Sequence, residues 1–192
     1  MQRLVVATGN PGKLKEMQAY LTELDIELRL KPKEIEVDET GSTFMENARL
    51  KASQVATALN EWAIADDSGL EIDALGGAPG LYSARYANSD EECIDRVLRE
   101  MQGIEDRAAQ FVCAVAIARP DGAIALERAG VCRGEILKER RGLSGFGYDP
   151  IFYVPQCQMT FAEMDASTKH GISHRGQAFH ELLPDLINLI ST

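Results

Sequence analysis

The sequence has little cysteine and no long hydrophobic segment. Its four cysteines form no C-x-x-C pair, so the sequence indicates neither a zinc site nor a redox pair, and we expect buried, reduced thiols. The longest apolar stretch, residues 108–118, is interrupted by Gln110 and is far shorter than the roughly 20 residues of a membrane-spanning helix. The first residues reach Thr8 and Gly9 too early for a signal peptide. We therefore expect a cytoplasmic protein without a membrane partner.

The sequence also lacks an excess of positive charge. Lysine and arginine number 20 against 30 aspartates and glutamates, which gives a net charge of −10. A surface this acidic repels a polyphosphate backbone, so no nucleic acid polymer is expected as a partner. Small phosphorylated substrates stay possible, because a metal ion and a few local cations can outweigh the global charge. The apolar fraction of 45% is typical of a folded globular chain.

Hydrophobic periodicity predicts alternating strands and helices early in the chain. The expected strands cover 4–7, 26–30 and 63–65, and the expected helices cover 13–24, 43–61 and 89–101. A long hairpin at 108–137, a glycine-rich loop at 141–150 and a final helix at 173–190 follow, and Pro184 should kink or interrupt that helix. Helices that alternate with strands, together with a central hairpin, predict an α/β fold with a mixed sheet.

The segment Thr8-Gly9-Asn10-Pro11-Gly12-Lys13 is the first candidate binding motif. It follows an expected strand and opens an expected helix. Glycines let a backbone approach an anion, helix N–H groups point toward it, and the lysine adds a positive charge. The spacing differs from that of a Walker A loop. An ordinary strand-to-helix turn is the alternative interpretation.

Two acidic segments are candidates for metal binding. Asp66 and Asp67 follow the short expected strand at 63–65, and Asp38 and Glu39 lie in a separate acidic stretch. Paired carboxylates can bind a hard divalent cation, and one of them can position a water molecule. The alternatives are an Asx turn at the first segment and a solvated acidic loop at the second.

The last candidates lie in the second half of the chain. Phe146 and Tyr148 stand among glycines in a loop, where aromatic rings suit stacking on a flat base. Lys169, His174 and Arg175 follow, and such side chains can read exocyclic oxygens or neutralise phosphates. An anchored loop and plain surface residues are the alternatives. The remaining histidines, His170 and His180, are expected at the surface.

In order along the chain, these segments resemble the inosine triphosphate pyrophosphatase family, whose enzymes cleave non-standard purine nucleoside triphosphates. The resemblance extends over almost the whole chain, and the string from Ala65 to Ala87 is its most specific part. The matching stretches are TGNPGK at 8–13, ETGSTFMENARLKA at 39–52, ADDSGLEIDALGGAPGLYSARYA at 65–87, GFGYDPIF at 145–152 and ISHRGQA at 172–178.

The resemblance implies one domain over residues 1–192, with a curved mixed β-sheet flanked by helices and two lobes around a central cleft. It implies an Mg²⁺-dependent hydrolysis of ITP, dITP and XTP to the monophosphate and pyrophosphate, which keeps these nucleotides out of DNA and RNA. A homodimer is implied as well. Hypoxanthine and xanthine carry a 6-oxo acceptor where adenine has an amino donor. A site that donates there can reject adenine by about 10⁴-fold or more.

The resemblance also assigns roles to individual residues. Asp67 is implied to be the general base and, with Glu39, to hold Mg²⁺, while Arg175 is implied to read the 6-oxo group. The residues implied to contact the triphosphate, the sugar or the base are Thr8, Gly9, Asn10, Pro11, Gly12, Lys13, Lys51, Ser68, Arg85, Phe146, Gly147, Tyr148, Asp149, Lys169, His174 and Arg175.

Two other functions compete with this interpretation. The glycine turn and the carboxylates also suit a related pyrophosphatase that acts on pyrimidine or modified triphosphates. A non-catalytic nucleotide-binding module is the other alternative, although such a module would not need to retain Lys13, Glu39 and Asp67. Turnover of a panel of triphosphates distinguishes these three functions.

Overall fold

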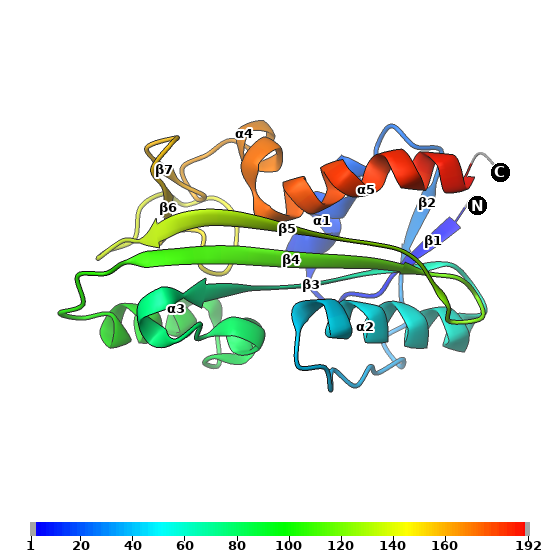
Figure 1. Cartoon of the computed structure of the whole chain (residues 1–192), viewed down its shortest axis with the longest axis horizontal. Helices are drawn as coiled ribbons and strands as arrows, with labels where there is room; N and C mark the ends of the chain where they lie inside the picture. Colours follow the sequence, from blue (N-terminus) through cyan, green and yellow to red (C-terminus); the bar gives the residue numbers. More distant parts are fainter. Residues whose placement is uncertain (1–2, 191–192) are drawn as a thin grey trace. The chain divides into compact units, whose positions relative to one another are not determined.

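The structure is a computed structural model that describes residues 3–190. Helices and strands alternate along the first half of the chain, and two long strands follow (Figure 1). The elements are β1 (Arg3–Val6), α1 (Pro11–Tyr20), β2 (Glu27–Leu30), α2 (Phe44–Leu59), β3 (Ala63–Ile72), the 3-10 helices η1 (Asp73–Leu75) and η2 (Gly80–Arg85), α3 (Asp90–Glu100), β4 (Ala108–Ala118), β5 (Ile124–Ile136), β6 (Phe152–Val154), β7 (Met159–Thr160), α4 (Ala166–Ile172) and α5 (His174–Ile190).

The strands form one mixed sheet in the order β2-β1-β3-β4-β5-β6-β7. β1 is parallel to both β2 and β3, with Arg3 opposite Glu27 and Val5 opposite Ala63. β6 is antiparallel to both β5 and β7. The predicted mixed α/β fold is therefore confirmed.

The chain divides into two compact units, each with its own hydrophobic core. Unit 1 contains the residues up to Asp67, Cys113–Gly130 and the residues from Arg175 onward, and unit 2 contains Ser68–Val112 and Val131–His174. Leu4, Met17 and Phe179 are buried in the core of unit 1. Val97 and Phe152 are buried in the core of unit 2. The single domain with a central cleft stays a prediction.

Side-chain caps fix the starts of two predicted helices. The Thr43 hydroxyl accepts a hydrogen bond from the Glu46 amide at the start of α2, and Ser89 does the same for Glu92 at the start of α3. Such caps satisfy amides that have no partner inside the helix. α2 ends at Asn60, whose backbone is left-handed. The helices predicted at 43–61 and 89–101 are therefore confirmed.

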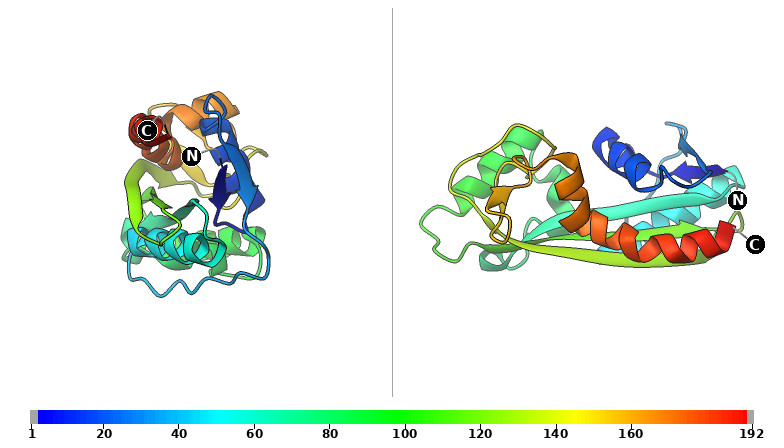
Figure 2. Two further views of the ribbon diagram at one scale, coloured as in Figure 1. Left: turned by 90° about the vertical axis from the view of Figure 1, so that its right-hand side faces the viewer. Right: turned by 90° about the horizontal axis from the view of Figure 1, so that it is seen from above.

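Several predicted boundaries differ from the structure; α1, for example, covers Pro11–Tyr20 where a helix over 13–24 was expected. The strand expected at 63–65 continues to Ile72, so Asp66 and Asp67 lie within β3 and not after it. The last helix was expected to be kinked or interrupted at Pro184, and α5 contains Pro184 without an interruption up to Ile190 (Figure 2). Leu182 and Leu186, on either side of Pro184, are fully buried in unit 1. Their packing keeps the segment helical even though proline provides no backbone N–H.

The cysteines lie largely inside the structure, as expected. Cys93, Cys113 and Cys132 are buried free thiols, and Cys157 is a half-buried one. Between residues 3 and 190, no helix combines the length and the apolar character that crossing a bilayer requires.

Candidate active site

The first candidate segment forms the predicted strand–turn–helix unit in unit 1. β1 ends at Val6 and α1 begins at Pro11. Between them, the Thr8 hydroxyl accepts a hydrogen bond from the Asn10 amide at 3.1 Å. The Asn10 side-chain oxygen accepts from the amides of Gly12 at 2.8 Å and Lys13 at 3.3 Å. Asn10 therefore caps α1, and its side chain occupies two of the amides that a helix N-terminus offers to an anion.

Asp67 lies at the centre of the second group of site residues in unit 1. Its carboxylate is buried, and its Oδ1 lies 2.7 Å from the Nζ of Lys51. The Asn47 side-chain amide donates to Oδ2 at 3.3 Å. Glu39 is also close, because its Oε1 lies 3.3 Å from the same Lys51 nitrogen. α2 therefore supplies both Lys51 and Asn47, which hold Asp67 in one orientation.

Burial raises the pKa of the Asp67 carboxyl above its ordinary value, although Lys51 beside it acts in the opposite direction. The Lys51 ammonium is itself buried, which would lower its pKa, but Asp67, Asp66 and Glu39 together raise it. Lys51 therefore stays charged. A carboxylate with a raised pKa accepts a proton more readily, which is the property that a general base requires.

Glu39 and Asp67 also fit the coordination of a hard divalent cation. Both carboxylates reach one positive charge, the Lys51 ammonium, so their oxygens converge on a single point. Within residues 3–190 no group of three or more histidine, cysteine, aspartate and glutamate side chains could hold a metal. Mg²⁺ often binds through only one or two carboxylates, with water and substrate phosphates as its other ligands. The residues present fit that pattern.

Asp66 faces the other side of β3, because neighbouring strand residues alternate in direction. Its Oδ2 lies 3.1 Å from the Nζ of Lys13 and 2.9 Å from one guanidinium nitrogen of Arg175. Another nitrogen of Arg175 contacts Glu16. Burial alone would raise the pKa of Asp66, but Lys13, Arg175 and Lys51 hold it well below its usual range. A second buried charge cluster thus lies behind the predicted base.

The aromatic loop in unit 2 is organised around the buried carboxylate of Asp149. Its Oδ2 accepts hydrogen bonds from the Phe146 amide at 2.9 Å and from the Lys169 ammonium at 2.6 Å. The same ammonium lies 5.0 Å from the centre of the Phe146 ring, a cation–π distance. Phe146, Asp149 and Lys169, which lie far apart in the sequence, therefore form one contact group.

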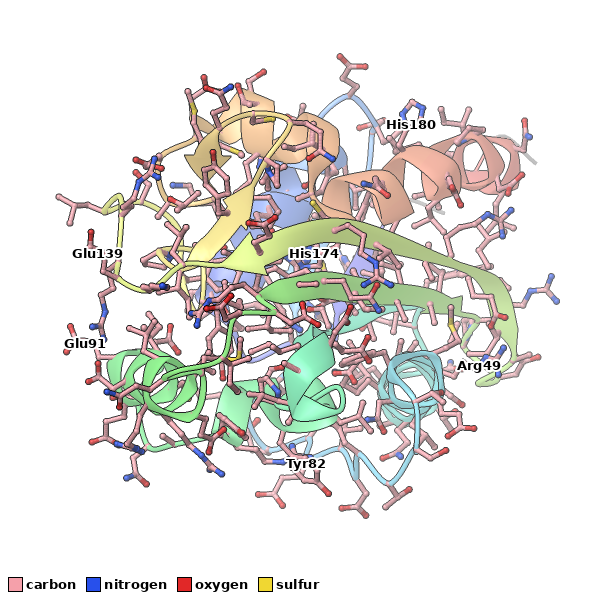
Figure 3. The ribbon with its side chains drawn as sticks, turned by 60° about the vertical axis from the view of Figure 1, so that its left-hand side comes forward. Arg49, Tyr82, Glu91, Glu139, His174 and His180 are labelled. Carbon is pink, nitrogen blue, oxygen red and sulfur yellow. The ribbon has the colours of Figure 1, made fainter. Side chains whose placement is uncertain are left out.

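Further contacts within unit 2 fix the neighbours of this group. The Tyr148 hydroxyl donates to the carbonyl of Ser83 at 2.9 Å, and the Gly147 amide donates to Asp90 at 2.9 Å. The His174 ring stacks on Phe111, with 4.7 Å between the ring centres, and is buried inside the molecule (Figure 3). His174 is therefore held by aromatic packing and is not a surface residue.

Four supporting residues were not predicted from the sequence. Glu16, Asn47, Asp90 and Phe111 each contact a predicted site residue through tertiary packing. Only helical spacing offered a partial indication, because Asn47 and Lys51 are four residues apart on α2 and share one face. Asp90 and Phe111 have no such pattern around them.

The remaining predicted residues differ in how far their side chains are exposed. Ser68 is half-buried in β3. Arg85 is exposed, and its guanidinium lies 5.2 Å from the ring centre of Tyr82, which is also exposed (Figure 3). His180 lies at the surface as expected (Figure 3), whereas His170 is half-buried.

We expect Gly145→Ala to destabilise the aromatic loop. Gly145 has φ of +80°, and an added Cβ would lie 1.9 Å from Oδ2 of Asp149. Left-handed strain and this clash together should cost about 2–4 kcal/mol of unfolding free energy. Gly147→Ala is the matched control, because Gly147 has φ of +57° but no atom within 4 Å of the added Cβ. Urea denaturation of both variants measures the difference. Equal losses would contradict the proposed clash.

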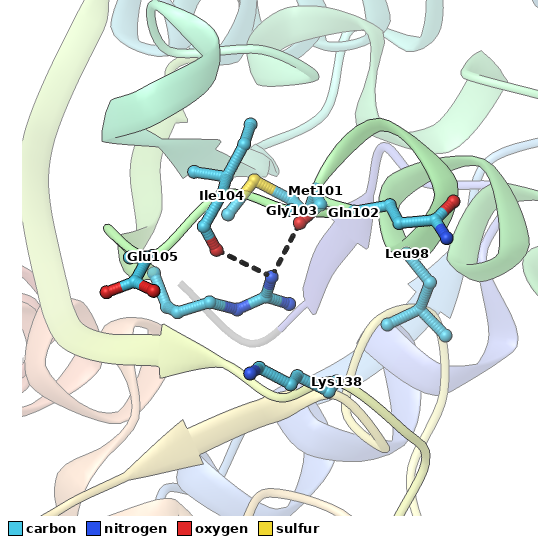
Figure 4. Close-up of a pocket in the computed structure, with 8 residues that line it drawn as sticks. Leu98, Met101, Gln102, Gly103, Ile104, Glu105 and Lys138 are labelled. Carbon is cyan, nitrogen blue, oxygen red and sulfur yellow. Dashed lines mark hydrogen bonds between the residues drawn. The ribbon is translucent and has the colours of Figure 1, made fainter.

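Unit 2 also contains a pocket of about 340 Å³ that no predicted site residue lines (Figure 4). It is lined by Leu98, Met101, Gln102, Gly103, Ile104, Glu105, Arg107 and Lys138. The Arg107 guanidinium donates to the carbonyl oxygens of Met101, Ile136 and Leu137 at 2.6–2.8 Å. Arg107 therefore ties the segment after α3 to the end of β5.

Comparison with known proteins gives consistent results. Residues 4–185 match the sequence model of the Ham1 family. A protein of Nostoc sp. named dITP/XTP pyrophosphatase is 61% identical over 189 residues, or 98% of this chain and 96% of that one. A protein of the same name from Synechocystis sp. is 62% identical over 183 residues, or 95% and 94% of the two chains. The solved structure of a HAM1 protein from Coxiella burnetii superimposes with a TM-score of 0.89 at 45% identity, covering 98% of this chain and 100% of that one.

Proposed function

Because the chain belongs to the Ham1 family, we propose that it is a pyrophosphatase of non-standard purine nucleoside triphosphates. It hydrolyses dITP, XTP and ITP to the monophosphate and pyrophosphate, and so keeps these nucleotides out of DNA and RNA. The resemblance to the inosine triphosphate pyrophosphatase family agrees with the two relatives, each named dITP/XTP pyrophosphatase. The observation that supports the chemistry best is the buried Asp67 beside Lys51 and Glu39.

Hydrolysis between the α and β phosphates requires an activated water and a stabilised leaving group. Asp67 is proposed as the base, because its pKa is raised by burial and Asn47 and Lys51 fix its orientation. Lys51 carries a positive charge next to this carboxylate and can neutralise charge on the phosphates. Water attack and charge neutralisation thus depend on side chains that already contact one another.

Mg²⁺ is the proposed cofactor, held by Glu39 and Asp67. When bound, it would neutralise phosphate charge and polarise the phosphoryl oxygens. The two carboxylates share the Lys51 ammonium, so Lys51 would balance their charge before the metal binds. The segment from Thr8 to Lys13 is proposed to hold the triphosphate, with Arg85 as a further phosphate contact.

Unit 2 is proposed to supply the groups that bind the base and the sugar. Phe146 offers an aromatic face, and Lys169, held by Asp149, offers a charged donor. Ser68, Gly147, Tyr148 and His174 are the other proposed contacts of this group. Arg175 remains the proposed reader of the 6-oxo group, although its guanidinium already contacts Asp66 and Glu16.

A product assay tests the proposed reaction. The purified chain is incubated separately with ITP, XTP, GTP, ATP and dTTP in the presence of Mg²⁺, and the products are separated by anion exchange. We expect IMP and pyrophosphate from ITP, with little product from ATP or GTP. IDP and phosphate would overturn the cleavage position. Preference for dTTP would favour a pyrimidine-specific enzyme, and binding without any product would favour a binding module.

Two further proposals concern assembly and location, and the first comes from the family resemblance alone. We propose that the chain forms a homodimer, and equilibrium sedimentation at micromolar concentration tests this, since a monomer would contradict it. We also propose a cytoplasmic location, where a nucleotide pool is available as substrate. Cell fractionation with a detectable tag tests the location.

A further inference from the structure

We propose that Asp66 is a positioning residue that holds the ammonium of Lys13 in place for the triphosphate. Asp66 itself does not touch the substrate and acts through Lys13. This inference depends on the proposed function, because it assigns Lys13 to the phosphates. It assigns a role to Asp66, the aspartate beside the predicted base. The proposed reaction does not itself require a second carboxylate at this position.

The exposure of the two side chains indicates which of them a phosphate can reach. Oδ2 of Asp66 lies 3.1 Å from Nζ of Lys13, and the side chain of Asp66 is 0% exposed against 15% for Lys13. An approaching phosphate oxygen can therefore contact the ammonium but not the carboxylate.

Asp66 is itself fixed by a second cation. Arg175 contacts the same Oδ2 through two nitrogens, at 2.9 and 3.3 Å. Cys113 also lies against this oxygen, with its sulfur 4.0 Å away. Arg175 shares its charge between Asp66 and Glu16, so Asp66 keeps a second cationic partner while the ammonium of Lys13 also contacts a phosphate. Removing a cation from a buried anion without such compensation would be costly.

The buried charge cluster of Asp66, Arg175 and Glu16 contacts α1 twice, because α1 carries both Lys13 and Glu16. Glu16 contacts Arg175, and Glu16 follows Lys13 by three residues on α1, a spacing that places both side chains on one face. The contacts therefore run from Lys13 to Asp66, to Arg175, to Glu16 and back to α1. This closed set fixes α1 and β3 against each other at the phosphate-binding segment.

Holding Lys13 in advance favours substrate binding. A free lysine side chain loses rotamer freedom when it binds a phosphate, and ordering one such side chain beforehand changes affinity by up to about tenfold. Asp66→Asn is therefore expected to raise the KM for ITP about tenfold, with little change in kcat. A general loss of structure would lower kcat as well.

A double-mutant cycle tests whether Asp66 acts through Lys13. KM and kcat are measured for Asp66→Asn, Lys13→Met and the double variant. We expect Asp66→Asn to raise KM in the wild-type background and to have no further effect when Lys13 is methionine. An equal increase in KM in both backgrounds would overturn the proposal, because Asp66 would then act independently of Lys13.

Glu16→Gln is the matched control, since it alters the same buried cluster through Arg175. We expect it to lower the thermal midpoint and to raise KM much less than Asp66→Asn does. An increase in KM as large as that of Asp66→Asn would attribute the effect to the cluster as a whole and would overturn the specific role of Asp66.

A measurement on the unmodified chain keeps the proposal testable if Asp66→Asn does not fold. Lysine side-chain NMR of the wild type is expected to give a resolved ammonium resonance for Lys13, which the Lys13→Met variant assigns. Lys51 and Lys169, which are also paired with carboxylates, should give such resonances too. Absence of the Lys13 resonance while those of Lys51 and Lys169 are present would overturn the proposal. If the wild type neither hydrolyses nor binds any triphosphate, the proposed function fails, whereas this resonance still reports on the pair.

Discussion

Replacing Asp67 with asparagine is expected to lower kcat for ITP by about 10²–10⁴-fold, the usual contribution of a positioned base. An amide cannot take a proton from water at neutral pH. The side chains have the same shape, and the asparagine oxygen can still accept from Lys51. Its amino group then faces the donating amide of Asn47, so one hydrogen bond is lost. Steady-state kinetics, with the thermal midpoint as a check on folding, measure the effect.

Glu39→Gln is the informative companion to Asp67→Asn. Glu39 is assigned to the metal only, so its loss should weaken Mg²⁺ binding, and added Mg²⁺ should restore part of the rate. The Asp67 variant should stay inactive at every Mg²⁺ concentration, because it lacks the base as well. Near-full activity of Asp67→Asn, or its rescue by Mg²⁺, would contradict the assignment of Asp67 as the base.

The elements that follow from local chemistry could be predicted from the sequence. Thr43 and Ser89 each precede a glutamate by three residues, and both cap the expected helices. The alternating apolar pattern from Phe111 to Ile117 likewise predicts β4. In each case neighbouring residues carry the whole pattern, so that no distant contact is needed to interpret it.

The extent of β3 could not be predicted, because the reason for it is not local. Two adjacent aspartates suggest the end of a strand, since a buried carboxylate without a partner is too costly for a core strand. In the structure Lys13 from α1 pairs with Asp66 and Lys51 from α2 pairs with Asp67. These two helices supply the charges that let β3 continue to Ile72.

The partners of Arg175 in the candidate site could not be predicted from the sequence either. The family resemblance implies a contact with the base, and nothing near residue 175 in the sequence indicates another partner. Its carboxylate contacts are 109 residues away at Asp66 and 159 residues away at Glu16. A prediction from the sequence can name a residue of the site, but its buried partners depend on how α1, β3 and α5 pack.

Replacing Arg175 with methionine is expected to lower the unfolding free energy by about 3–5 kcal/mol. Its side chain is 2% exposed, and its removal leaves Glu16 without this cation and leaves Asp66 dependent on Lys13. Carboxylates that lose a buried partner must be desolvated without compensation. Chemical denaturation of the variant and the wild type measures the loss.

The conservative variant Arg175→Lys separates the two roles of Arg175. A lysine keeps the positive charge but cannot contact Asp66 and Glu16 with a planar fork, so we expect it to recover only part of the stability. If Arg175 also reads the 6-oxo group, the ratio of kcat/KM for ITP to that for ATP should fall in the lysine variant even where it remains folded. An unchanged ratio together with a large loss of stability would assign Arg175 to the buried cluster alone, because a residue that contacts only Asp66 and Glu16 stabilises the site without discriminating between bases.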